Sequence, residues 1–274
     1  MQRIEHANGV VTYTFDTLAA LPVAAHVSTR HGGVSPAPWT GLNFSVARGD
    51  DADRVAENRR RLGEALDMPP NQWVTCTQVH GTGVARVDDS HAGLRMAGCD
   101  ALITDTLNLP LVLVFGDCTP ILLYDPHHHA LGICHAGWRG TVNGAAAAVV
   151  WAMQAAFNSE PATLQAAIGP SIGPDSYEVG DEVLQMALVK LPGAERFFVW
   201  PQGAGGKPHF DLWQANAVQL HEAGLRLEHI EIAGIDTARS TAEFFSHRAE
   251  QGRSGLFAMT AMLLPPSPTP EVAP

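Results

Sequence analysis

The fold is decided by residues 111–137, LVLVFGDCTPILLYDPHHHALGICHAG, in which apolar runs alternate with short polar turns. The runs 111–115, 119–124 and 131–134 are rich in Leu, Ile and Val. Short apolar runs of this kind are typical of strands that are buried on both faces of a sheet. We therefore predict that this stretch forms the centre of a β-sheet.

Segments with helical character lie on both sides of these strands. Helices are predicted at 53–67, 141–157, 181–190 and 211–224. In the first of them, Val55, Leu62 and Leu66 share one face, on which Asn58 and Arg59 also lie. A polar side chain that faces inward must find a partner. Asn58 and Arg59 are therefore expected either to bond a nearby loop or to belong to a site.

The remaining elements indicate one α/β domain. Further strands are predicted at 13–30, 73–81, 100–104 and 227–235. Alternation of strands and helices is typical of layered α/β proteins, and no internal repeat or linker divides the chain. We predict a single catalytic domain over 1–264. The end, 265–274, reads PPSPTPEVAP, has too little apolar content to pack, and is predicted to be a disordered tail.

Bulk composition excludes several classes of protein. The 274 residues are 46% hydrophobic and 16% charged, and no apolar run approaches the roughly 18–20 residues of a membrane span. The first residues carry no secretory or lipidation motif, which predicts a cytoplasmic protein without a membrane partner. A formal charge of -11 repels phosphate backbones, so nucleic acid is not expected as a partner. The oligomeric state cannot be read from the sequence, because no coiled-coil repeat is present.

Histidine or cysteine occurs near glycine at the ends of several predicted strands. The three segments are Val79-His80-Gly81, Gly116-Asp117-Cys118 and Cys134-His135-Ala136-Gly137. Two imidazoles and a thiolate suit a d-block ion such as zinc, and they leave a fourth position for water. We predict that His80, Cys118 and His135 hold one catalytic metal ion. The same residues also fit a second interpretation, in which Cys118 is a nucleophile activated by His135 or His80.

Several polar side chains are candidates for contacts to substrate or phosphate. Arg139 lies in the turn before the alanine-rich helix, whose free N–H groups would favour an anion. Arg30 follows a strand and precedes two glycines, and Arg248 lies in the segment FFSHR. Asn43 and Arg59 complete the predicted set.

Other polar clusters have a simpler structural explanation. His127, His128 and His129 follow Asp125-Pro126 between two strands, so a solvated hairpin turn is expected there. The pairs Cys76/Cys99 and Asp100/Asp105 are predicted to be packing and turn residues. Asp100 has a second interpretation as a carboxylate that orients a histidine ligand.

The chain resembles one known family, the laccase-domain proteins, also called the polyphenol oxidase or peptidoglycan editing factor family, with purine nucleoside phosphorylase activity. The resemblance spans nearly the whole chain and rests on ordered segments: STRHGGVSPAPWTGLNFS, GDDADRVAENRRRL, TQVHG, CDALIT, GDCTPILLYDP, CHAGWRGT, IGPSIGPDSYEVGDEV and FFSHR.

This resemblance implies a fold, a metal and a set of reactions. The fold is an α/β/β/α sandwich with mixed sheets, related to bacterial toxin deamidases and cysteine hydrolases. The ligands are His80, Cys118 and His135, normally with zinc. The activity is phosphorolysis of adenosine, inosine, guanosine and methylthioadenosine with inorganic phosphate as co-substrate, together with adenosine deamination. A different activity implied by the editing-factor name is an amidase that removes misincorporated serine from peptidoglycan precursors.

The older name implies copper-dependent oxidation of polyphenols, which the histidine pattern disfavours. Multicopper oxidases need several coppers and repeated His-x-His pairs, whereas only His127 and His129 have that spacing here. Copper remains an alternative ion for a site with two histidines and one cysteine. Deamination by the common zinc-deaminase pattern is disfavoured too, because no Pro-Cys-x-x-Cys follows the single His-x-Glu at His229.

Some positions depart from the family pattern. Paired cysteines are usual where Asp175-Ser176 stands, and a further cysteine is usual near Thr237. The common FFSYRR is here Phe244-Phe245-Ser246-His247-Arg248-Ala249, which lacks one aromatic residue and one arginine. We expect these changes to affect the rim of the substrate pocket and leave the metal ligands unchanged.

Overall fold

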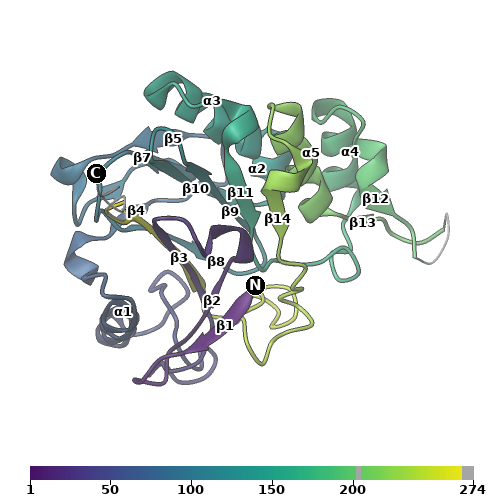
Figure 1. The fold of residues 1–274 in the computed structure, drawn as a ribbon. Helices are drawn as coiled ribbons and strands as arrows, with labels where there is room; N and C mark the ends of the chain where they lie inside the picture. The colour runs from purple at the N-terminus through teal and green to yellow at the C-terminus, as the bar shows by residue number, and fades with distance from the viewer. Residues whose placement is uncertain (202–204, 267–274) are drawn as a thin grey trace.

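A computed structural model describes residues 1–201 and 205–266. The predicted disordered tail, 265–274, lies outside the described residues except for its first two positions. Two large sheets face each other, with helices on their outer sides (Figure 1). None of the helices in the described part of the chain is both long enough and apolar enough to cross a membrane.

The first sheet has seven strands in the order β1-β2-β3-β15-β8-β4-β6. Its strands are β1 (Gln2–Glu5), β2 (Val11–Thr14), β3 (Val23–Ser28), β15 (Phe257–Leu263), β8 (Leu111–Phe115), β4 (Val74–Cys76) and β6 (Arg95–Met96). The pairs of β4 with β8 and with β6 are parallel, and the others are antiparallel. The last strand, β15, thus lies between β3 and β8, so that a strand from near the end of the sequence pairs with one from near its beginning.

The second sheet has six strands in the order β14-β11-β9-β10-β7-β5. Its strands are β14 (Ile230–Ile232), β11 (Gln165–Ile168), β9 (Thr119–Asp125), β10 (Ala130–Ala136), β7 (Ala101–Thr104) and β5 (Val84–Arg86). The outer pairs β11–β14 and β5–β7 are parallel, and the inner pairs are antiparallel. A small separate pair joins β12 (Phe198–Val199) to β13 (His209–Phe210).

The helices lie outside the sheets. They are α1 (Ala52–Leu66), α2 (Trp138–Val142), α3 (Ala145–Phe157), α4 (Asp181–Lys190) and α5 (Leu212–Glu222). Short 3-10 segments span Asp16–Leu18, Pro70–Gln72, Asp89–His91, Pro161–Thr163, Ala194–Phe197 and Leu227–His229. In Figure 1, α3 and α5 cover the six-stranded sheet, and α1 lies on the far side of the seven-stranded sheet.

Strand periodicity explains how the layers pack. In β8, Leu111, Leu113 and Phe115 face the core between the sheets, and Val112 faces α1. The strands of the second sheet alternate in the same way, with one face in the core between the sheets and the other against α3 and α5. Each fully buried Leu, Ile or Phe contributes about 1.5–3 kcal/mol. Apolar side chains on both faces of a strand are therefore stabilising, which agrees with the buried strands predicted within residues 111–137.

The predicted class, α/β with mixed sheets, is confirmed, and its relation to the toxin deamidases stays a prediction. Several boundaries differ from expectation. The predicted strands at 73–81 and 227–235 are shorter, because β4 ends at Cys76 and a 3-10 segment over Leu227–His229 precedes β14. The predicted strand at 13–30 is two strands, because a 3-10 turn and Pro22 separate β2 from β3. The alanine-rich helix begins at Ala145 and not at 141, because Gly144 adopts a φ of +87° and ends the short helix α2 before it.

Candidate metal centre

His80 lies in the loop that follows β4, where its backbone has an unusual conformation. Its φ is 60°, a left-handed value that is uncommon outside glycine. The carboxylate of Asp100 accepts hydrogen bonds from the backbone N–H groups of Val79, His80 and Gly81, at 3.1, 2.9 and 2.7 Å. These bonds hold the loop in the strained conformation, in which the His80 ring lies beside that of His135, with 4.9 Å between the ring centres.

His135 lies near the end of β10, on the face of the strand that looks into the core between the sheets. The residue is 3% exposed, so its polar atoms need partners inside the protein. The Nδ1 atom lies 2.9 Å from Asp100 Oδ1. With Nδ1 engaged by a carboxylate, Nε2 is the nitrogen that remains for a metal ion.

Cys118 is in the short connection between β8 and β9. Asp117 before it has a φ of 84°, and its carboxylate accepts hydrogen bonds from Thr237 Oγ1 at 2.7 Å and from Arg248 N at 2.6 Å. Gly137 faces the same space, where a Cβ atom would lie 2.9 Å from His80 Cδ2 and 3.0 Å from Cys118 Sγ. Glycine is therefore required at this position for His80 and Cys118 to approach each other.

The structure brings the three predicted residues together. One nitrogen of His80, one nitrogen of His135 and the sulfur of Cys118 lie within 4.8 Å of one another. Their burial increases from the exposed His80 through the partly exposed Cys118 to the buried His135. Two imidazoles and a thiol that converge from two loops and the end of strand β10, and leave one side open, fit the donor set of a zinc or copper ion. The site is thus compatible with a single metal ion.

The protein alone stabilises a charged pair at this site. Burial works to raise the pKa of the Cys118 thiol, but the neighbouring His135 and His80 outweigh it and lower that pKa. Burial also works to lower the pKa of His135, but Cys118 and Asp100 reverse this effect and raise it. Cys118 is therefore favoured as a thiolate, the form that binds metals and reacts with electrophiles.

This electrostatic environment leads to a prediction about alkylation. In protein treated with a chelator, iodoacetamide at pH 7 is expected to modify Cys118 about tenfold faster than a free cysteine, because a larger fraction of it is thiolate. Cys76 and Cys134 should stay unmodified, since burial raises the pKa of both thiols. Peptide mass spectrometry would measure the labelling. One equivalent of zinc should protect Cys118, and equal labelling with and without zinc would contradict a metal site.

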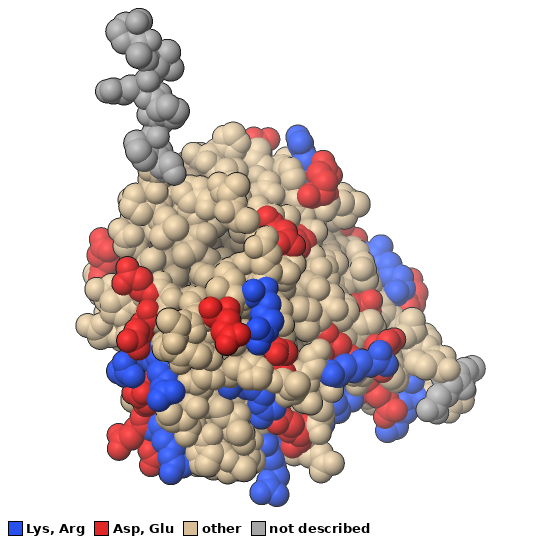
Figure 2. Space-filling model, turned by 60° about the horizontal axis from the view of Figure 1, so that its bottom comes forward, with Lys and Arg blue, Asp and Glu red and all other residues tan. Residues whose placement is uncertain are grey.

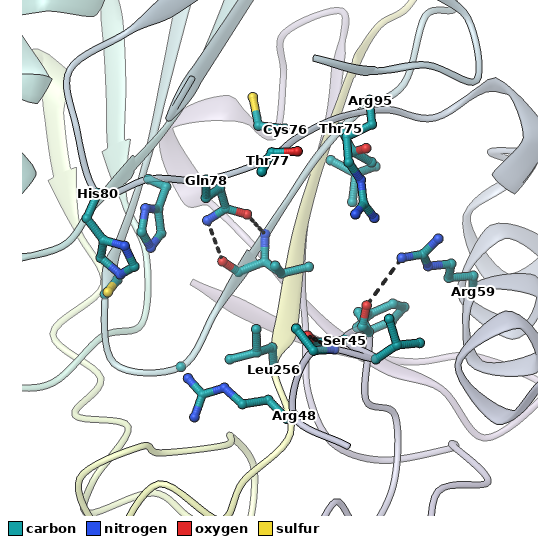
Figure 3. Close-up of a pocket in the computed structure, with 18 residues that line it drawn as sticks. Ser45, Arg48, Arg59, Thr75, Cys76, Thr77, Gln78, His80, Arg95 and Leu256 are labelled. Atoms are coloured by element: carbon teal, nitrogen blue, oxygen red, sulfur yellow. Dashed lines mark hydrogen bonds between the residues drawn. The ribbon is translucent and has the colours of Figure 1, made fainter. Parts of the chain in front are cut away.

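Two cavities meet at His80 and Cys118. The first has a volume of about 350 Å³ and is lined by Arg48, Arg59, Arg95 and Gln78 beside His80, Cys118 and His135 (Figure 3). The second has a volume of about 410 Å³ and is lined by Trp138, Arg139, Tyr177, His247 and Arg248 beside His80 and Cys118. We call them the arginine cavity and the aromatic cavity. Arg48, Gly116, His80 and Cys118 line both of them.

Three of the five predicted substrate contacts line these cavities. Arg59 lines the arginine cavity, and Arg139 and Arg248 line the aromatic cavity. Arg139 differs from expectation in one respect, because it lies inside the short helix α2 and not in a turn before the alanine-rich helix. The guanidinium carbon of Arg139 lies 4.2 Å from the centre of the Trp138 indole ring.

The other two predicted contacts hold loops together. The Arg30 guanidinium donates to the carbonyls of Thr40 and Thr241 and to the Glu250 carboxylate. Asn43 is fully buried, and its side chain bonds the backbone of Ser45 and Leu256 together with the Asp50 carboxylate. Neither residue is among those that line the two cavities.

The histidine run 127–129, Asn58 and the pair Cys76/Cys99 have structural roles outside the candidate metal site. Asp125 Oδ1 accepts hydrogen bonds from the N–H groups of His127 and His128, which is the turn expected for the histidine run. Asn58 is fully buried and donates to Ser35 Oγ and to the carbonyl of Asn43, so it bonds a nearby loop. The sulfurs of Cys76 and Cys99 lie 2.7 Å apart inside the protein.

Five further residues line the two cavities but were not among the substrate contacts predicted from the sequence: Arg48, Arg95, Gln78, Trp138 and Tyr177. Arg48 and Arg95 come from a loop and a two-residue strand without periodicity, so nothing local marked them. A detectable clue existed for Trp138 and Tyr177, because both lie in segments that carried the family resemblance, CHAGWRGT and IGPSIGPDSYEVGDEV.

Taken together, the two-sheet fold and the cluster of His80, Cys118 and His135 define a class: an α/β protein with a candidate site for one metal ion. The family described as multi-copper polyphenol oxidoreductase laccase matches residues 24–264. The chain belongs to this laccase family. Within the described residues, His80, Cys118 and His135 form a single group able to hold a metal, which contrasts with the several coppers in the family's description.

Relatives in this family share most of the chain. The purine nucleoside phosphorylase YlmD of Geobacillus stearothermophilus is 39% identical over 238 residues, which are 84% of this chain and 86% of the relative. A purine nucleoside phosphorylase of Bacteroides thetaiotaomicron is 32% identical over 249 residues, which are 88% and 92%. The crystal structure of YlmD from Geobacillus stearothermophilus superposes with a TM-score of 0.88 at 36% identity, covering 96% of this chain and 99% of that one.

Another solved structure shares the same fold. The hypothetical protein YfiH of Bacillus licheniformis superposes with a TM-score of 0.87 at 30% identity, covering 95% of this chain and 98% of that one. The mixed α/β fold and nearly the whole chain length are therefore shared with these two solved structures.

Proposed function

We propose that this chain is a zinc-dependent purine nucleoside phosphorylase that acts on adenosine, inosine, guanosine and methylthioadenosine, with inorganic phosphate as co-substrate and adenosine deaminase as a second activity. The observation that carries the proposal is the metal-compatible group His80, Cys118 and His135 between two cavities. The names of several relatives, purine nucleoside phosphorylase, support the same reaction class.

His80, Cys118 and His135 would hold the zinc ion. When bound, zinc supplies a Lewis acid that polarises an oxygen or nitrogen of the substrate. The protein's own contribution is to fix the ligands, and Asp100 does this for both histidines through its bonds to the His80 loop and to His135. Preorganised ligands need not rearrange when the substrate reacts.

The aromatic cavity suits the purine. Trp138 and Tyr177 offer ring faces on which a flat base can stack, and Ile172 and Leu212 add apolar surface. In phosphorolysis a phosphate oxygen bonds to the ribose C1′ while the C1′–N9 bond breaks. The electron pair of the broken bond leaves with the purine, which finally carries the proton that the phosphate has lost. Arg139 and Arg248 line the same cavity and would stabilise the negative charge that develops on the base.

The charge of the protein determines which classes of partner it can attract. On the face drawn in Figure 2, basic and acidic residues are interspersed. The formal net charge is -11. A surface of mixed sign on a negatively charged chain disfavours a nucleic acid backbone and leaves small nucleosides as the proposed substrates.

Product analysis tests the proposed function. Zinc-replete protein incubated with adenosine and phosphate is expected to release adenine and ribose 1-phosphate. Without phosphate it should release inosine and ammonia, because water replaces the amino group at C6. Liquid chromatography would measure the products, and Cys118→Ala protein prepared in the same way would control for contaminating phosphorylases. If equimolar enzyme forms neither adenine nor inosine, the proposal fails.

One arrangement favours a second candidate function. Asp100, His135 and Cys118 form a connected series in which a carboxylate orients a histidine beside a thiol, as in cysteine hydrolases. We therefore keep as an alternative an amidase that removes misincorporated serine from peptidoglycan precursors. Chelator-treated protein should then cleave such a precursor faster than zinc-loaded protein, since zinc would occupy the nucleophile. Equal or faster cleavage with zinc would exclude Cys118 as the nucleophile.

A further inference from the structure

The arginine cavity contains several guanidinium groups next to the candidate metal site. Arg48 comes from the loop before α1, Arg59 from α1 itself and Arg95 from β6, so three separate segments contribute. In Figure 3, the side chains of Arg59 and Arg95 point toward the same space, and Arg48 lies on the side nearer His80. Convergence of arginines from distant segments is a property of the fold and not of local sequence.

None of these three arginines has an acidic partner within 4.0 Å in the described ranges 1–201 and 205–266. Their neighbours on α1 behave differently, because Arg60 and Arg61 both pair with Glu57, at 2.7 and 2.8 Å. Burial lowers the pKa of Arg59, and the nearby charge of Arg95 lowers it further. The cavity thus concentrates positive charge that the protein itself does not neutralise, in a chain of net charge -11.

The fold makes little use of these charges. Arg59 donates one long hydrogen bond, 3.4 Å, to the carbonyl of Phe44. Arg48 contacts the ring of His247 at 2.9 Å and the carbonyl oxygen of Gly252 at 3.3 Å. Neither partner carries a negative charge. Arg48 and Arg59 are partly buried, whereas Arg95 is exposed and reaches the cavity from its rim. A guanidinium kept partly buried without a counter-ion costs stability, so a ligand that supplies the missing negative charge explains the placement of Arg48 and Arg59 better than packing does.

We propose that the arginine cavity is a subsite for a phosphate-class oxyanion, held by Arg59 and Arg95, with Arg48 between it and the metal ligands. Guanidinium groups match the geometry of phosphate oxygens through paired N–H donors. The amide of Gln78, which also lines the cavity, is bonded to the backbone of Val114 and stays neutral. Placed here, the oxyanion lies in a different cavity from the one proposed for the purine, and the two cavities share Arg48, Gly116, His80 and Cys118.

The catalytic role of this subsite rests on the proposed function. In phosphorolysis, the phosphate held there would attack C1′ from the side opposite to the departing base. The oxyanion could come from two sources: free inorganic phosphate, or a phosphate monoester carried by the nucleoside. The cavity volume of about 350 Å³ leaves room for either of them.

Equilibrium binding without turnover tests the subsite. Inorganic phosphate would be titrated into zinc-replete protein by calorimetry, for the wild type and for Arg59→Gln, Arg95→Gln and Arg54→Gln. Arg54 is the matched control, because it is an exposed arginine on the same helix and does not line the cavity. Each of the first two changes should weaken phosphate binding by at least about tenfold, because each removes a charged donor. Arg54→Gln should leave it unchanged.

A second titration with adenosine and adenosine 5′-monophosphate distinguishes the sources. If both bind equally and only inorganic phosphate depends on Arg59 and Arg95, the subsite takes free phosphate. If the monophosphate binds more tightly and loses this advantage in both variants, the subsite takes a phosphate monoester. Undiminished binding of both anions to Arg59→Gln and Arg95→Gln overturns the inference. Phosphate binding that depends on these arginines, in a protein that cleaves no nucleoside, would refute only the proposed function.

Discussion

His80→Ala, Cys118→Ala and His135→Ala are each expected to reduce bound zinc from about one ion per chain to nearly none, because two remaining ligands hold zinc weakly. The three donor atoms lie within 4.8 Å of one another, so each contributes directly to the same site. Zinc would be measured by elemental analysis after dialysis against a buffer with a fixed low concentration of free zinc.

His128→Ala is the matched control for these changes. His128 belongs to the hairpin turn after β9 and bonds Asp125, so its removal leaves the candidate site intact. It should retain about the same zinc as the wild type. A thermal melt of each variant shows whether it is folded, and a folded Cys118→Ala that keeps a full equivalent of zinc would contradict the ligand assignment.

Asp100→Asn is expected to weaken zinc binding by about 10–100-fold, although Asp100 does not touch the ion. Each carboxylate oxygen is used twice: Oδ1 accepts from His80 N and His135, and Oδ2 accepts from Val79 N and Gly81 N. An amide keeps only one of these oxygens, and its NH₂ group then faces N–H donors. Either the His80 loop or the His135 ring must lose its orientation. Competition with a chelating indicator dye would measure the change in affinity.

Asp100→Asn should also lower stability, because each buried donor left without a partner costs about 1–3 kcal/mol. Asp105→Asn is the control, since Asp105 is exposed and its ion pair with Arg86, at 3.2 Å, is worth little at a surface. If Asp100→Asn binds zinc within about twofold of wild type, Asp100 does not position the histidines.

The sequence predicted best where local rules apply. Strands buried on both faces, such as β8 and β9, have uninterrupted apolar runs, and α1 has a regular apolar face that begins after Asp51. The side chain of Asp51 accepts hydrogen bonds from the N–H groups of Asp53 and Arg54, a common helix start. His80, Cys118 and His135 were recognisable because all three are metal-ligand types at or near the ends of the strands predicted from the sequence.

The sequence could not predict contacts between distant segments. Arg30 resembles a ligand arginine in sequence, yet Thr241 and Glu250 engage it from more than 200 positions away. Conversely, Arg95 lies in a stretch without clear periodicity and reaches the arginine cavity only because β6 pairs with β4. Such residues acquire their role from the order of strands in the sheet, which local patterns do not encode.

A cobalt titration tests the central claim, that His80, Cys118 and His135 hold one metal ion, most directly. Co²⁺ bound to a thiolate gives a sulfur-to-metal charge-transfer absorption in the near ultraviolet, whereas Co²⁺ bound to histidines alone does not. With metal-free wild-type protein, this absorption should rise linearly and saturate at about one equivalent. It should be absent from Cys118→Ala. Saturation without a charge-transfer band, or the same band in Cys118→Ala, would contradict the account.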